Sequence, residues 1–181
     1  MLAVAAAVPH GIDTLFTLSG AHIFPLYDAA AAATPPVRVV DVRHEQTAVF
    51  AAEGLARLTR RPGLAAVTAG PGVTNTVSAV TTAWFNSTPL LLLGGRAPQY
   101  RWGTGALQEL DHPPLLAPVT KAAATVSTTG DIARQVSQAL RLACLPPRGP
   151  VFLDVVIAPE ENVFPIVPAG QAINRMIGEL A

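Results

Sequence analysis

Short runs rich in apolar and β-branched residues alternate along this chain with longer runs rich in alanine, and this alternation restricts the fold more than any other feature. Such repeats are typical of α/β domains in which helices cover a parallel sheet. We therefore predict an α/β fold, an open parallel sheet of about six strands flanked by helices. The expected strands are residues 14–18, 37–41, 64–68, 90–94, 122–126 and 151–156.

The expected helices lie between these strands. They begin near Ile23, Glu45, Val73 and Asp131, with a short one at residues 113–116. Glu53 and Arg57, four positions apart, predict an exposed helix face. Residues 96–107 hold Gly, Pro, Trp and Tyr without periodicity, and a loop of this length in a compact domain is often functional.

Composition limits the classes of partner. With 181 residues and half of them hydrophobic, the chain fits one domain with large buried elements and a surface that other subunits could cover. A formal net charge of zero argues against nucleic acid as a partner. The first eight residues are apolar but lack a basic leader and are too short to span a bilayer, so we expect no membrane partner.

The single cysteine, Cys144, cannot form an intrachain disulfide, and an intracellular, reducing compartment is the simplest expectation. We predict a soluble cytoplasmic protein in which this thiol has a buried structural role.

Two motifs carry the chemistry. Arg-His-Glu-Gln at 43–46 and Gly-Pro-Gly-Val-Thr-Asn at 70–75 place a carboxylate and a tight glycine turn at the ends of two strands that we expect to be neighbours. A helix and an apolar strand separate them, so both motifs should fall on one edge of a parallel sheet. Ligands of open α/β sheets bind at that edge.

Glu45 is the carboxylate in question. At a helix N-terminus the helix dipole favours the anion, whereas an apolar site favours the protonated acid, and either form can hydrogen-bond a ring nitrogen. A helix-start carboxylate exposed to water is the alternative, and the residues alone favour it. His44 is expected to pack or hydrogen-bond rather than to act as a base, because adjacent helical residues point in different directions.

The glycine turn is the second element of the predicted site. Gly70, Pro71 and Gly72 would let the backbone approach a planar ligand closely, and Asn75 offers both a donor and an acceptor. An ordinary strand-to-helix turn is the alternative. No Gly-Lys-Ser/Thr follows, and Asn75 replaces the third glycine of a dinucleotide fingerprint, which argues against phosphate binding. The four His residues predict no metal site.

The run from residue 11 to 156 resembles the pyrimidine-binding (Pyr) domain of thiamine-diphosphate-dependent enzymes, most closely that of acetolactate synthase large-subunit-like proteins. The resemblance rests on the order and spacing of several segments together with the two motifs above. These segments are Gly-Ile-Asp-Thr-Leu-Phe (11–16), Pro-Leu-Tyr-Asp (25–28), Ala-Ala-Glu-Gly-Leu-Ala-Arg (51–57), Asn-Ser-Thr-Pro-Leu (86–90), Gly-Ala-Leu-Gln-Glu (105–109) and Gly-Pro-Val-Phe-Leu-Asp (149–154).

The resemblance implies roles for individual residues. Glu45 would bond N1′ of the cofactor's aminopyrimidine and promote the tautomer that removes the thiazolium C2 proton, so that a 2-oxo acid can be decarboxylated. The loop with Gly20 and the turn with Pro71, Gly72 and Asn75 would line the pyrimidine, which makes them cofactor-binding residues.

Gln108 would face the active-site cavity as a second catalytic residue; a surface-loop cap is the alternative. Leu107 stands where the family has an aromatic, and Ala21 where it usually has a second glycine, so a divergent member is expected.

The resemblance also implies what the sequence lacks. The cofactor is thiamine diphosphate, whose diphosphate is held through Mg²⁺ by a domain with a Gly-Asp-Gly to Asn motif that we do not find in the 181 residues. We predict a Pyr domain at 1–157 and, at 158–181, a linker or the start of a middle domain, for which FAD is an open question. A metal-binding domain of another chain and a homodimer or larger assembly are the expected partners, with a 2-oxo acid as substrate.

Three functions stay open. The first is the Pyr domain of an acetolactate synthase-like carboligase that joins a two-carbon unit from pyruvate to a second 2-oxo acid. The second is the small subunit of a split 2-oxo acid decarboxylase of the sulfopyruvate decarboxylase type. The third is a non-catalytic Pyr-like domain that binds or regulates a partner.

Overall fold

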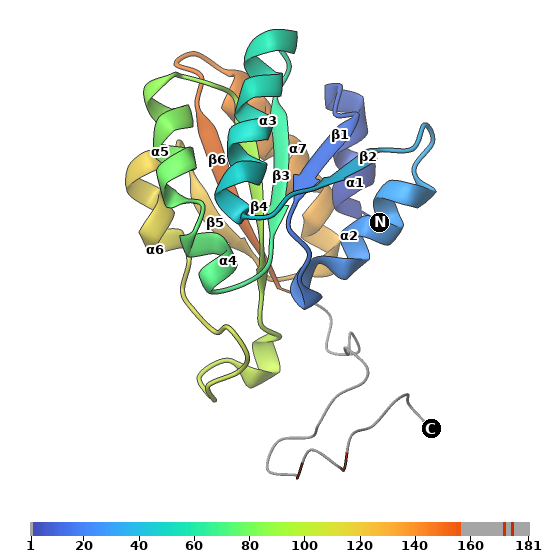
Figure 1. Cartoon of the computed structure of the whole chain (residues 1–181), viewed down its shortest axis with the longest axis vertical. Coiled ribbons are helices and arrows are strands. Elements are labelled where there is room, and N and C mark those ends of the chain that lie inside the picture. Colours follow the sequence, from blue (N-terminus) through green and yellow to red (C-terminus); the bar gives the residue numbers. More distant parts are fainter. Residues whose placement is uncertain (1, 157–171, 173–174, 176–181) are drawn as a thin grey trace.

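The chain forms one six-stranded sheet in which every strand runs parallel to its neighbours (Figure 1). The computed structural model describes residues 2–156, 172 and 175. The spatial order of the strands is β2-β1-β3-β4-β6-β5. This confirms the predicted fold class. The strands are β1 Thr14–Thr17, β2 Arg38–Asp41, β3 Gly63–Val67, β4 Leu90–Arg96, β5 Ala123–Val126 and β6 Pro150–Val156.

Helices begin within a few residues of each predicted start, and α1, which was not predicted, precedes β1. They are α1 Leu2–Ala7, α2 Phe24–Ala32, α3 Glu45–Thr59, α4 Pro71–Thr74, α5 Val77–Phe85, α6 Pro113–Leu116 and α7 Ile132–Cys144, with 3₁₀ turns η1 Val8–His10, η2 Ala21–Ile23, η3 Gln99–Arg101, η4 Ala117–Val119 and η5 Thr129–Asp131. None of the helices in the described ranges is long and apolar enough to cross a bilayer. The predicted linker at 158–181 lies outside the described residues, apart from residues 172 and 175.

Two apolar layers hold the sheet between them. Successive residues of β4 alternate between the layers: Leu91 and Leu93 join the cluster formed with α1, α2 and α7, whereas Leu90 and Leu92 join the cluster formed with α3 and α5. Every residue of β3 and β4 is buried. Burial on both faces explains why these strands read as continuous apolar runs in the sequence.

The expectation that the strands before Glu45 and Gly70 are neighbours is wrong. β1 lies between β2 and β3 and pairs with both. The chain therefore leaves β1 towards one side of the sheet and returns to its other side, which makes the carboxyl ends of β1 and β3 a topological switch point. The two motifs still come to the same edge of the sheet, as predicted, because all strands are parallel.

The exposed helix face predicted from Glu53 and Arg57 is confirmed for Arg57 and wrong for Glu53. Glu53 is 5% exposed, because α3 packs against α5 at this point. Its Oε1 accepts hydrogen bonds from Nδ2 of Asn86 at 2.7 Å and from Oγ1 of Thr88 at 3.4 Å, and the exposed Arg57 guanidinium lies 3.8 Å away. The carboxylate thus ties α3 to the end of α5.

Candidate functional site

Glu45 is the first residue of α3, and its side chain is only 9% exposed. His44 precedes it in an extended conformation and caps the helix, since its Nδ1 accepts a hydrogen bond from the backbone N–H of Gln46 at 3.1 Å. The hydrogen-bonding role predicted for His44 is confirmed. The alternative of a carboxylate exposed to water does not describe Glu45, which is buried although the adjacent His44 is exposed.

Asn75 contacts this carboxylate directly. Its Nδ2 donates to Oε2 of Glu45 at 3.0 Å. The single helix predicted to begin near Val73 is wrong, because the structure has two helices there, α4 and α5, and Asn75 lies directly after α4. Among the hydrogen bonds of the described residues, none reaches the other oxygen of Glu45, Oε1. One carboxylate oxygen is thus fixed and the other is open to a ligand.

The glycines of the site are needed for close packing. Gly70 has φ 56° and ψ −116°, a left-handed conformation that favours glycine, and a Cβ there would lie 2.9 Å from the Gln108 carbonyl oxygen. A Cβ on Gly72 would lie 2.7 Å from Cγ2 of Thr68, and one on Gly20 would lie 2.4 Å from Cβ of Thr68. On these sides the space is filled by the chain itself rather than left open to a ligand.

Pro71 begins α4, where its missing N–H leaves no hydrogen bond unmade, and it is exposed. The turn thus combines a glycine with positive φ, a proline that starts the helix and a glycine whose missing side chain leaves room for Thr68.

Thr68 is the centre of the site, and the sequence analysis missed it. Its hydroxyl donates to Oε1 of Gln108 at 3.1 Å, and its oxygen lies 3.1 Å from Nδ1 of His22. A hydroxyl has one proton, so with that proton on Gln108 the Thr68 oxygen accepts from His22. Gln108 itself has φ 58°, which holds it against Gly70. Thr68 directly follows β3, at the carboxyl edge of the sheet, and that position was the signal available.

His22 is a second residue that sequence reasoning missed. It is 7% exposed, and burial lowers the pKa of its imidazole, with the nearby His112 adding to this effect and the Leu107 carbonyl opposing it. A Cβ on Gly95 would lie 2.4 Å from Cβ of His22, so the close approach of β4 keeps His22 in place. Its place two residues after Gly20, in the loop after the first strand, could have indicated it.

A third group of residues, which sequence reasoning also missed, supports the glycine turn through hydrogen bonds. Nε2 of His112 accepts the backbone N–H of Gly70 at 2.8 Å, and Nδ1 of His112 lies 3.0 Å from Oδ1 of Asp154. NH1 of Arg96 donates to Oδ2 of Asp154 at 2.6 Å. His112 and Asp154 are 0% exposed. Buried charged and polar groups persist when they are paired. Both ring nitrogens of His112 and both carboxylate oxygens of Asp154 have partners here, whereas Nε of Arg96 is buried and has none among the described residues.

The loop between β4 and α6 carries Gln108 and is tied down at two points. The Arg96 guanidinium lies 3.6 Å from the centre of the Trp102 ring. The Glu109 carboxylate accepts the backbone N–H groups of Ala106 at 2.9 Å and Gly103 at 2.7 Å, and these bonds lower its pKa. The loop therefore presents Gln108 in a defined position.

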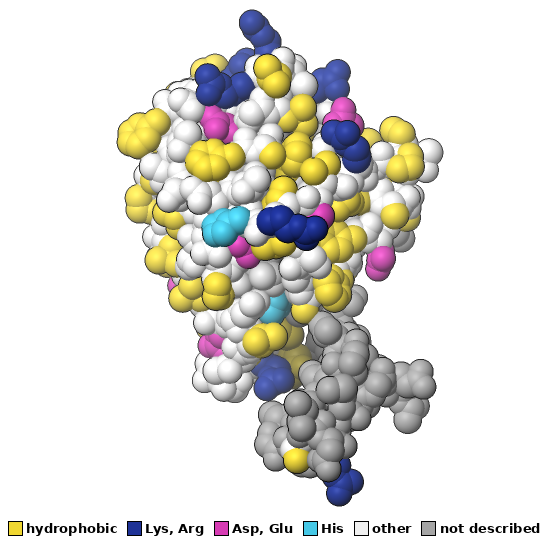
Figure 2. All heavy atoms as spheres, in the orientation of Figure 1, with side chains coloured by type: hydrophobic (Ala, Val, Ile, Leu, Met, Phe, Trp, Pro, Cys, Tyr) yellow, Lys and Arg dark blue, Asp and Glu magenta, His cyan; other side chains and the backbone are white. Residues whose placement is uncertain are grey.

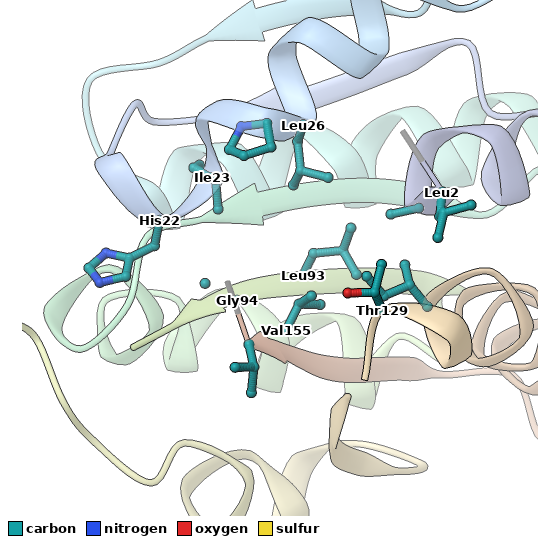
Figure 3. Close-up of a pocket in the computed structure, with 13 residues that line it drawn as sticks. Leu2, His22, Ile23, Leu26, Leu93, Gly94, Thr129 and Val155 are labelled. Atoms are coloured by element: carbon teal, nitrogen blue, oxygen red, sulfur yellow. The ribbon is translucent and has the colours of Figure 1, made fainter. Parts of the chain in front are cut away.

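A cavity of about 300 Å³ lies beside this site, on the face covered by α1, α2 and α7 (Figure 3). Leu2, Leu26, Leu93 and Val155 contribute to its apolar wall, and His22 lies at one end of it. Neither Glu45 nor Asn75 lines it. The cavity is thus adjacent to the convergent polar groups without containing them.

No group of three or more His, Cys, Asp or Glu side chains that could hold a metal ion occurs in the part of the chain that the structure describes.

Cys144 was predicted to be buried, but the structure shows it half-buried. Burial raises the pKa of its thiol, and the positive charges of Arg148 and Lys121 oppose this effect. A raised pKa disfavours the nucleophilic thiolate.

A parallel sheet with a buried carboxylate, an amide and a glycine turn at its switch point defines a ligand-binding α/β domain. The family comparison makes this class specific. Residues 2–115 match the model of the thiamine pyrophosphate enzyme N-terminal TPP binding domain, and the chain belongs to this family.

The relatives found among curated proteins extend the comparison. The chain is 45% identical over 188 aligned residues to acetolactate synthase large subunit IlvG of Mycobacterium tuberculosis, covering 94% of this chain and 34% of that protein. It is 47% identical to 2-hydroxyacyl-CoA lyase 2 of Danio rerio, covering 82% of this chain and 24% of the relative, and 41% identical to the human protein of that name, covering 93% and 27%. The chain thus spans about a third or less of the length of these relatives.

Proposed function

We propose that this chain forms the aminopyrimidine-binding half of a thiamine diphosphate site in an acetolactate synthase-like enzyme that decarboxylates and joins 2-oxo acids. The observation that carries the proposal is Glu45, a buried carboxylate with one oxygen bonded to Asn75 and the other open. Family membership and the likeness to acetolactate synthase relatives support it.

The residues fit an aminopyrimidine. Oε1 of Glu45 can share a proton with a ring nitrogen, and Asn75 keeps the carboxyl group oriented while it does so. Burial of Glu45 at the N-terminus of α3 limits competition from water for this bond. When bound, thiamine diphosphate supplies a thiazolium that accepts the electrons of the bond broken next to a carbonyl. Glu45 would therefore be the residue that controls a proton on the cofactor's pyrimidine.

Gln108 would serve the substrate side of the site. Its carbonyl Oε1 accepts the Thr68 hydroxyl, and within the described residues its side-chain amide nitrogen makes no hydrogen bond, so the amide can donate to a carboxylate or carbonyl oxygen. Gly20, Pro71 and Gly72 would form the wall around the pyrimidine.

The diphosphate and Mg²⁺ would be held by a domain of another chain or of the longer protein, with FAD an optional feature of a middle domain. We expect residues 1–157 to act as one Pyr domain and an oligomer to complete the site. The face over α3 and α5 supports assembly, since hydrophobic side chains are exposed on it (Figure 2). Phe50 is 39%, Trp84 37% and Phe85 80% exposed.

A second function is favoured by specific relatives. Proteins named 2-hydroxyacyl-CoA lyase 2 match the chain at 41% to 48% identity. Cleavage next to a carbonyl carbon uses the same electron-accepting cofactor chemistry as decarboxylation. A 2-hydroxyacyl-CoA thioester is therefore the alternative substrate class to pyruvate.

Glu45→Gln tests the proposal in the assembled enzyme. We expect it to lower kcat by about 10²–10⁴-fold, because an amide cannot exchange the proton, while the unfolding midpoint stays close to that of the parent. The matched control is Asp131→Asn, the same acid-to-amide change at a partly exposed residue before α7, which should leave kcat unchanged. Assays with pyruvate and with a 2-hydroxyacyl-CoA separate the two functions. Unchanged turnover of both substrates by Glu45→Gln would refute the role of Glu45.

A further inference from the structure

A chain of buried hydrogen bonds ends on the glycine turn of the site. It runs from Asp154 on β6 through the His112 ring to the backbone N–H of Gly70, with separations of 3.0 Å and 2.8 Å. The His112 ring also lies edge-on to Phe152, with 6.4 Å between ring centres. Packing alone would explain the contact with Phe152. It would not explain the two hydrogen bonds, which fix the positions of both ring nitrogens.

The direction of these bonds fixes the tautomer of His112. A backbone N–H can only donate, so Nε2 of His112 must present its lone pair to Gly70. The proton then lies on Nδ1 and is donated to Oδ1 of Asp154. The other oxygen, Oδ2, accepts from Arg96 at 2.6 Å, so Asp154 has a partner on each oxygen.

The turn held in this way leads to Glu45. The Gly70 carbonyl accepts the N–H groups of Val73 and Thr74 at 3.0 and 3.1 Å, which starts α4 in a fixed direction. Asn75 follows α4 and donates its side-chain amide to Glu45. A rotation of the Gly70 peptide would therefore move Asn75 relative to the carboxylate.

We infer that His112 is a positioning residue: through the Gly70 N–H it sets the turn that places Asn75 against Glu45. The expected effect of His112 on cofactor binding rests on the proposed function, whereas its effect on the position of Asn75 relative to Glu45 does not. His112 touches neither Glu45 nor Asn75 through any hydrogen bond of the described residues, so its effect is transmitted by backbone.

The tautomer is measured first, by ¹⁵N NMR of the histidine side chains in the unaltered chain. We expect an unprotonated Nε2 and a protonated Nδ1 for His112. The reverse tautomer, with the proton on Nε2, would overturn the inference, since Gly70 would then have no acceptor.

Variants test the transmission to Glu45. His112→Phe keeps an aromatic ring but removes the acceptor, and we expect amide exchange of Gly70 to accelerate at least tenfold and the side-chain amide signals of Asn75 to shift. His112→Gln offers an oxygen near the position of Nε2 and should retain part of the protection. His10→Gln is the matched control, because His10 hydrogen-bonds Ser137 of α7, away from the site. Unmoved Asn75 signals in folded His112→Phe would overturn the inference. If that variant does not fold, His112→Gln decides the question. Gly70 protection that is lower than in the parent but not lost, together with shifted Asn75 signals, supports the inference, whereas parent-like protection, or lowered protection with unmoved Asn75 signals, overturns it.

Calorimetry with thiamine diphosphate, Mg²⁺ and the metal-binding half links the turn to the cofactor. We expect His112→Phe to bind at least tenfold more weakly than the parent and His10→Gln to bind equally well. Equal affinity of His112→Phe and parent would overturn the link to cofactor. No binding by the parent would instead refute the proposed function, while the Gly70 and Asn75 signals still decide the role of His112.

Discussion

Thr68→Val is the perturbation that most directly tests the architecture of the site. Valine has nearly the shape of threonine, so the change removes the hydroxyl without opening a cavity. Two hydrogen bonds disappear, each 3.1 Å long: one from the hydroxyl to Gln108 and one from the His22 ring to the Thr68 oxygen. The predicted effect is therefore a loss of stability that arises from stranded polar groups rather than from packing.

The magnitude follows from the burial of the two partners. His22 is 7% exposed, so an unpaired Nδ1–H costs about 1–3 kcal/mol. Gln108 is partly exposed and can turn to water, so its loss lies near the lower end of the range for a single hydrogen bond, about 0.5 kcal/mol. The free energy of unfolding should fall by about 2 kcal/mol, which moves the urea midpoint by roughly 1 M.

The assay is urea unfolding followed by circular dichroism, with Thr81→Val as the matched control. The Thr81 hydroxyl donates only to the Val77 carbonyl within α5 at 2.8 Å, so its removal should cost no more than about 0.5 kcal/mol. A double-mutant cycle with Gln108→Ala should show coupling of about 0.5 kcal/mol or more. A Thr68→Val protein as stable as the control would refute the view that Thr68 organises the site.

Two further predictions concern backbone space and pH. Gly20→Ala should lower the free energy of unfolding by about 1–3 kcal/mol in urea, because its Cβ would lie 2.4 Å from Cβ of Thr68. The control, Gly54→Ala in the middle of α3, meets nothing within 4 Å and should raise the free energy of unfolding by about 0.5–1 kcal/mol. Equal effects of the two substitutions would contradict the packing described for Gly20. His22 has a folded-state pKa below its ordinary 6.5, so the unfolded chain takes up this proton first as the pH falls. The contribution of His22 to stability is complete above pH 6.5 and is lost as the pH falls from there through the folded-state pKa. Below pH 6.5 the free energy of unfolding should therefore fall more steeply with decreasing pH in the parent than in His22→Gln. Parallel plots of unfolding free energy against pH for the two proteins would exclude His22 as the cause.

The sheet and its helices could be predicted from the sequence because a doubly covered parallel sheet has a strong signature. Fully buried β3 and β4 read as continuous apolar runs, and α3 begins at Glu45 as expected. The order of strands was less accessible. The residues of β1 carry no pattern that predicts its place between β2 and β3, because strand order depends on how whole βαβ units pack.

The exposure predicted for Glu53 failed for a related reason. Spacing of four residues from Arg57 is compatible with an exposed helix face, but it carries no information about α5, whose end covers the carboxylate and supplies Asn86 as its partner.

Some residues of the candidate site could be proposed from the sequence. The structure brings Gly20, Pro71, Gly72 and Asn75 to one edge together with Glu45 and Gln108. Thr68, His22 and His112 were not found, since a lone threonine or histidine has no spacing pattern that sets it apart from a packing residue. Their importance depends on partners more than 40 positions away in the chain, such as Thr68 for His22 and Gly70 for His112.

The separation between partners has a consequence for how the site forms during folding. Glu45 and Asn75 are 30 positions apart, Gly70 and His112 42, and Arg96 and Asp154 58. Each link closes a long loop, and the entropy of such closures is recovered only once the sheet is in place. The site should therefore be among the last parts to become ordered as the chain folds, and its geometry should disappear in a single cooperative step when the sheet opens.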